Sequence, residues 1–202
     1  MAANKNGVYS VELSVNGKIY SLYDFESFSF GETRYINTLV DYEYLGRNRQ
    51  RIQKSFKSAG NNLGIYKELY NNGEIDINEG LSYTAKLLIK DYSGNKTVLN
   101  IPIEGVKNYE TRSREKETTD NYIIANKPNN FDLGSAKVYF PTNTFYKDFY
   151  IDLKKGNDTV TIHNNTVPAH RNFTITFDAS KYPKEIQKQL FIARLDSKLQ
   201  PN

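Results

Sequence analysis

Alternation of apolar and polar residues dominates the start of the chain. Over residues 8–15, Tyr9, Val11, Leu13 and Val15 alternate with smaller or polar side chains, which is the period of a half-buried β-strand. An Asn-Gly pair follows at residues 16–17 and favours a type I′ hairpin turn. The sequence therefore predicts a β-hairpin that returns over residues 18–23.

A second, longer hairpin is expected over residues 81–104. Its first arm again alternates apolar and polar positions, and Gly94 with Asn95 tolerates the positive φ of a tight reversal. The return arm contains Pro102, which lacks a backbone N–H and therefore suits a sheet edge or a strand end. A hairpin of this length needs a second layer to cover its apolar face.

Between the hairpins the pattern is less regular. Residues 25–30 predict a crossing strand, and the helical spacing of Ile36, Leu39 and Val40 predicts a helical turn or an irregular cap. A polar, basic loop over residues 47–54 then leads into a short strand around Phe56, and further short strands precede the second hairpin. Several short strands that end in a long hairpin are typical of an immunoglobulin- or fibronectin-like β-sandwich, expected here over residues 1–105.

Residues 106–121 are rich in charge and poor in apolar side chains, so they predict a linker. Beyond it the chain predicts a second β-sandwich over residues 122–202, open to being incomplete at its C-terminal edge. One short helix is expected over residues 182–189, followed by a last strand over residues 190–195. The other strands of this unit are expected at residues 122–125, 136–140, 149–153, 159–162 and 172–178. The fold class is thus all-β, with two consecutive sandwich units.

Composition narrows the function classes. The chain has 202 residues, with 16 Tyr and 11 Phe that supply core volume, and no Cys, which excludes disulfides and thiolate zinc sites. The formal net charge of +4 is spread along the chain, and residues 1–105 carry 12 basic and 12 acidic side chains. No nucleic-acid partner is expected from so mild an excess. No apolar run is long enough for a membrane span, and residues 1–6 contain no signal-peptide h-region.

Candidate catalytic residues are scarce. His163 and His170 are the only histidines, and neither HExxH nor GxSxG occurs. Carboxylates cluster near Glu74 and along residues 148–152, but solvated turn and strand faces explain such clusters more simply than acid–base pairs. We therefore predict no catalytic residue, no metal ligand and no cofactor in this chain.

The sharpest charge feature is the basic run at residues 47–54. Its arginines follow two tyrosines, which together could contact an anionic polymer or stack on sugar rings. The simpler alternative is a solvated loop whose arginines pair with acids of the same unit. The candidate ligand contacts are Tyr42, Tyr44, Arg47, Arg49 and Arg51.

Several stretches carry a family resemblance. These are residues 28–37 (FSFGETRYIN) with Asp41-Tyr42, residues 59–67 (AGNNLGIYK), residues 139–150 (YFPTNTFYKDFY) and residues 162–168 (IHNNTVP). They resemble the region downstream of the peptidase domain in exported lysostaphin-like zinc metalloendopeptidases (the murein endopeptidase family) of Bacteroidetes-type bacteria. In that family an HxxxD element and an HxH element hold zinc, and the enzyme cleaves peptide cross-links of peptidoglycan.

This chain contains neither HxxxD nor HxH, so no catalytic role transfers to its residues. The resemblance implies a non-catalytic accessory region that positions the catalytic domain or contacts the wall. Zinc is expected only in a catalytic domain outside this chain, which would be a partner together with peptidoglycan or another wall polymer. The expected location is the periplasm or cell surface of a bacterium, for a chain cut from a longer exported protein. The alternatives are a stand-alone carbohydrate- or anionic-polymer-binding module and a structural or adhesion protein of the cell surface.

Overall fold

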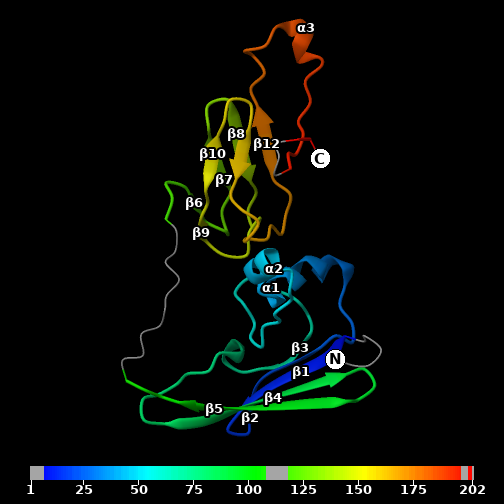
Figure 1. Ribbon diagram of the computed structural model, residues 1–202, viewed down its shortest axis with the longest axis vertical. Helices are drawn as coiled ribbons and strands as arrows, with labels where there is room; N and C mark the ends of the chain where they lie inside the picture. Colours follow the sequence, from blue (N-terminus) through cyan, green and yellow to red (C-terminus); the bar gives the residue numbers. More distant parts are fainter. Residues whose placement is uncertain (1–6, 108–117, 197–199, 202) are drawn as a thin grey trace.

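The computed structural model describes residues 7–107, 118–196 and 200–201. Antiparallel strands form most of the regular structure, with only short helices between them, so the predicted all-β, sandwich-like fold is confirmed. Two units follow one another along the chain, and the helical part of the first lies between its sheet and the second unit (Figure 1). Within the described residues, no helix has the length and apolar character needed to span a membrane.

The first unit is built on a five-stranded sheet of order β3-β2-β1-β4-β5. Asn16 and Gly17 both adopt positive φ, 48° and 84°, as the predicted type I′ turn requires. The two predicted hairpins are therefore confirmed and pair with each other through β1 and β4. The strands are β1 (Val8–Val15), β2 (Lys18–Asp24), β3 (Tyr66–Leu69), β4 (Ser82–Asp91) and β5 (Lys96–Glu104).

Strand β5 is an edge strand, as Pro102 predicted. On the neighbouring strand β4, Thr84 lies opposite Pro102. Both backbone polar groups of Thr84 point away from β5, toward β1: its carbonyl accepts from Asn16 N at 3.0 Å, and its N–H donates to Asn16 Oδ1 at 2.8 Å. Pro102 must then turn its nitrogen toward the open edge. The missing N–H therefore falls on the free side of the strand, where no ladder bond is lost.

Short helices cover one face of this sheet (Figure 1): η1 (Phe30–Tyr35), α1 (Ile36–Leu39) and α2 (Tyr42–Asn48), with η2 (Asn71–Gly73) farther along the chain. The core beneath them contains Val11, Leu39 and Ile65 around Tyr23, which is 1% exposed. The Tyr23 hydroxyl donates to the Lys54 carbonyl at 3.0 Å, so the ring is buried with its polar end satisfied.

The second unit packs short strands around a phenylalanine-rich core of Ile123, Val138, Phe140, Phe145 and Ile151. Strand β8 alternates buried and exposed positions along its whole length, as its sequence predicts. The unit contains β6 (Tyr122–Ile123), β7 (Asn129–Asp132), β8 (Ala136–Phe140), β9 (Phe149–Tyr150), β10 (Leu153–Lys155), β11 (Val160–Ile162), β12 (Thr174–Phe177) and α3 (Lys184–Gln187). The predicted short helix is confirmed as α3.

Three sequence predictions are wrong in detail. Residues 25–30 form no crossing strand, because the chain leaves the sheet after β2 and enters η1. No strand forms at Phe56, and the nearest bridge in this loop is an isolated one that joins Gln53 to Val40. Residues 190–195 form no strand, and their apolar side chains Phe191 and Ile192 remain 80% and 67% exposed. Most of the predicted linker lies outside the described residues.

Candidate functional site

The two units meet through Arg34 at the end of η1. Its Nη1 donates to the His170 carbonyl at 2.6 Å, and its own carbonyl accepts from the Tyr146 hydroxyl at 2.6 Å. These bonds join residues separated by 136 and 112 positions in the sequence. Arg34 is thus held by the second unit at both its backbone and its side chain.

Three rings complete this junction. Tyr35 lies against His170, with ring centroids 4.5 Å apart, and against Tyr146 at 5.9 Å. The Tyr146 oxygen is 3.1 Å from His170 Nδ1. Because a phenol carries a single proton and Tyr146 donates it to Arg34, Nδ1 of His170 is the donor in this contact. The neutral ring therefore carries its hydrogen on Nδ1.

The junction favours the neutral form of both titratable rings. Burial, followed by the positive charges of Arg171 and Arg34, lowers the pKa of His170 from its usual 6.5. Burial is also the main reason that the pKa of Tyr146 is raised to about 12, with Tyr35 adding to the increase and Arg34 opposing it. At neutral pH the positive charge near this junction is thus that of the arginines.

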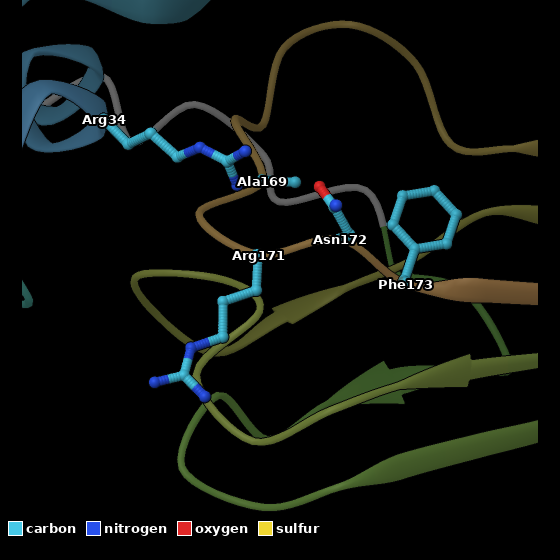
Figure 2. Close-up of a pocket in the computed structure, with 5 residues that line it drawn as sticks. All are labelled: Arg34, Ala169, Arg171, Asn172 and Phe173. Carbon is cyan, nitrogen blue, oxygen red and sulfur yellow. The ribbon is translucent and has the colours of Figure 1, made fainter. Parts of the chain in front are cut away.

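A pocket of about 400 Å³ opens beside this junction. It is lined by Arg34 from the first unit and by Ala169, Arg171, Asn172 and Phe173 from the segment that precedes β12. Figure 2 shows the Arg34 guanidinium extended toward Ala169, with Asn172 and Phe173 along the same segment and Arg171 leaving it on another side. The site therefore combines cationic, amide and aromatic groups drawn from both units.

The aromatic wall of the pocket is anchored in the core of the second unit. Phe173 contacts Phe140 with ring centroids 4.9 Å apart, and Phe140 is fully buried. Phe173 itself remains 36% exposed and offers its other side to the pocket. A ring fixed in this way presents apolar surface without losing side-chain freedom when a ligand binds.

The five residues predicted as ligand contacts lie together on and just after α2. Tyr42, Tyr44 and Arg47 belong to the helix, Arg49 is its left-handed C-cap with φ 57°, and Arg51 follows in an exposed segment. The prediction of a loop from residue 47 onward is wrong for the first two positions, which are helical.

Helix α2 is stabilised locally by an N-terminal cap and by an ion pair along its surface. The Asp41 carboxylate accepts from Tyr44 N at 3.0 Å, which satisfies one of the free donors at the helix start. Glu43 pairs with Arg47 at 2.8 Å, one helical turn later. The side chain of Arg47 is still 65% exposed, so this arginine remains accessible to solvent.

The α2 helix and the loop after it also approach the second unit. A Cβ built on Gly46 would lie 3.4 Å from the Asn165 carbonyl oxygen, and one built on Gly60 would lie 2.5 Å from the Tyr146 carbonyl oxygen. These close approaches require glycine at position 60, where φ is also +73°. The structure therefore places α2 and its basic C-terminal end at the edge of the junction.

Sequence reasoning did not select Arg34, Tyr35, Tyr146 or His170 as site residues. The signal that could have found the first three was the resemblance itself, since residues 28–37 and 139–150 contain them. His163 lies apart from the junction: its Nδ1 accepts from Asp152 N at 3.3 Å, and its ring contacts Phe149. Among the residues that the structure describes, no group of three or more His, Cys, Asp or Glu is arranged to hold a metal ion.

Comparison with known families concerns the second unit. Residues 120–201 match the family model of a Zu5-like domain, from just before β6 to the end of the described chain. No curated protein and no solved structure gives a significant match to the chain. The second unit is thus similar to Zu5-like domains, a likeness that names a domain type and no activity.

Proposed function

We propose that this chain is a non-catalytic accessory region of an exported zinc metalloendopeptidase that acts on peptidoglycan peptide cross-links. Its two β units would serve as a spacer and docking surface that positions the catalytic domain on the wall. Support comes from the family resemblance over residues 28–67 and 139–168, and from the Arg34 junction. The similarity of the second unit to Zu5-like domains is compatible with such a role.

The junction is the observation that carries this proposal. Domains joined within one chain reorient freely unless their interface is specific. Here Arg34 is bonded to the second unit through two contacts of 2.6 Å, and the Tyr35 ring contacts two rings of that unit. A spacer that holds its two units in one orientation transmits the position of one end to the other. Such a geometry suits positioning better than chemistry.

Three measurements test the proposal. The purified chain, incubated with Zn²⁺ and peptidoglycan, is expected to release no peptide fragments. The coding sequence upstream is expected to encode HxxxD and HxH. Deleting the region from the parent enzyme should leave cleavage of a small soluble cross-linked peptide intact and reduce cleavage of insoluble peptidoglycan. Turnover by the isolated chain, or an upstream sequence without a peptidase domain, would refute the proposal.

A second candidate function is direct binding of an anionic or carbohydrate polymer through α2. The observation that favours it is the exposure of Arg47, Arg49 and Arg51 at one end of a single short helix. Each cation near a polyanion releases counterions, so affinity should fall steeply with salt.

A pull-down against insoluble peptidoglycan and soluble glycans tests this candidate. The triple variant R47A/R49A/R51A should lose binding. A matched control removes the same charge from exposed positions of the second unit, Lys184→Ala, Lys188→Ala and Arg194→Ala. If the original chain and both variants bind the polymer equally well, or if none of them binds, direct binding through α2 is refuted.

A further inference from the structure

Two arginines line the junction pocket, Arg34 from the first unit and Arg171 from the second. Within residues 7–107 and 118–196, neither Arg34 nor Arg171 forms an ion pair with a carboxylate, whereas Arg47 and Lys181 each do. Both arginines also lie close enough to His170 to oppose its protonation. The Arg34 guanidinium extends toward Ala169, whereas the Arg171 side chain leaves the segment on another side (Figure 2). An anion beside Arg34 would therefore contact Arg34 and be attracted by Arg171 at longer range.

Arg34 is already held in place for such an anion. Its Nη1 is bonded to the His170 carbonyl and its backbone to Tyr146, which leaves the other guanidinium N–H groups available at the pocket. Binding would not need to order this side chain, so less conformational entropy is lost. A planar fork of N–H donors matches the two oxygens of a carboxylate or a phosphate.

The rest of the pocket defines what the anion is attached to. Phe173 supplies an apolar wall and Asn172 an amide that can donate or accept. The volume of about 400 Å³ suits a small group rather than a long polymer segment. The occupant is thus expected to combine one oxyanion with a compact apolar or planar body.

We propose that the pocket formed by Arg34, Arg171, Asn172 and Phe173 binds an oxyanion, a carboxylate or a phosphate, carried on a compact apolar group. Arg34 binds the oxyanion from the first unit, and Arg171 strengthens the local positive potential from the second. The apolar body lies against Phe173. This inference goes beyond the proposed function, because it holds for the isolated chain whether or not a peptidase precedes it.

Ligand binding at this site has a consequence for the junction. Arg34 belongs to the first unit and the other lining residues to the second, so an occupant bridges the two. Burial is the main cause of the lowered pKa of His170, and the positive charges of Arg171 and Arg34 add to it. A bound anion offsets these two charges. Occupancy should therefore raise the pKa of His170 toward its usual value while leaving His163, which lies elsewhere, unchanged.

The test uses the isotope-labelled chain and NMR at low ionic strength, where exposed charges are least screened. The titrants are benzoate, phenyl phosphate and benzamide, the last being a neutral analogue of the first. Saturable shifts of the backbone signals of Arg34 and residues 171–173 are expected with benzoate or phenyl phosphate. Benzamide should bind at least about tenfold more weakly, since it lacks the charge-assisted bonds. Comparison of the two anions shows which oxyanion the site prefers.

Matched variants make the test specific. Arg171→Ala removes an exposed side chain and should weaken binding about three- to tenfold, through loss of a nearby cation. Arg194→Ala removes the same charge from an exposed position that does not line the pocket, and should leave binding unchanged. Arg34→Lys keeps the charge but not the planar fork and should also weaken binding.

The proposal is overturned if neither anion gives saturable shifts at these residues, or if the shifts appear elsewhere on the chain. It is also overturned if benzamide binds as well as benzoate, or if Arg194→Ala weakens binding as much as Arg171→Ala. None of these outcomes involves peptidoglycan or zinc, so they are independent of the positioning function.

Discussion

Gly60→Ala is the sharpest test of the junction. A Cβ at this position would lie 2.5 Å from the Tyr146 carbonyl oxygen, whereas an ordinary carbon–oxygen contact is about 3.3 Å. The units must therefore separate locally by about 0.8 Å. The same displacement would lengthen the two 2.6 Å bonds of Arg34, to His170 and from Tyr146, to about 3.4 Å, beyond a normal hydrogen bond. Loss of both bonds would cost roughly 1–3 kcal/mol.

The matched control for this variant is Gly17→Ala. Gly17 has φ +84°, close to the +73° of Gly60, but nothing lies within 4 Å of the point that an added Cβ would occupy. Both substitutions place alanine in the left-handed region at about 1–2 kcal/mol, so only Gly60→Ala adds the clash. We expect NMR relaxation to show two independently tumbling units in Gly60→Ala alone, with both cores folded. Identical tumbling in the two variants and unchanged Tyr146 signals would refute the account of the junction.

Three further predictions concern stability. Tyr23→Phe leaves the Lys54 carbonyl without its buried donor and should cost about 1–3 kcal/mol in urea denaturation, whereas Tyr92→Phe at an 82% exposed position should change little. Phe140→Ala should lower the free energy of unfolding of the second unit by about 3–5 kcal/mol, because Phe140 is fully buried. Phe191→Ala, at an 80% exposed position, should change it very little. Because the folded state lowers the pKa of His170, the unfolded chain binds more protons as pH falls through 6.5, so stability should decline there. His170→Gln should flatten that decline, and an unaltered pH profile would contradict the assignment.

The regular strands were the most predictable part of the fold. The first hairpin combines alternation with an Asn-Gly turn, and the second has a partly alternating first arm and a glycine at positive φ in its turn, so local signals indicate both. The helix α2 was harder to foresee, because its signals are an Asp cap and one Glu–Arg pair rather than an apolar stripe. The last predicted strand failed because, within the described residues, the mainly apolar stretch 190–195 joins no strand and forms only an isolated bridge from Leu195 to Pro201.

The candidate site was only partly predictable. The basic residues of α2 stand out as a run in the sequence, and the structure keeps them close to one another and near the junction. Arg34 and His170 are separated by 136 positions, and no local pattern indicates that a guanidinium will meet a particular backbone carbonyl. Such pairs depend on how two finished units dock, and that docking is set by shape and charge across the whole interface.

The position of Pro102 has a consequence for how the protein behaves at high concentration. Backbone amides alternate in direction along β5, so Lys96, Val98 and Asn100 point their N–H groups toward the open edge of the sheet. The next outward-facing position is Pro102, which has no N–H to donate. A second extended chain could therefore form backbone hydrogen bonds with the first half of β5, and the pairing would end at Pro102. We therefore expect Pro102, which is exposed and lies outside both cores, to limit pairing between copies of the chain along β5.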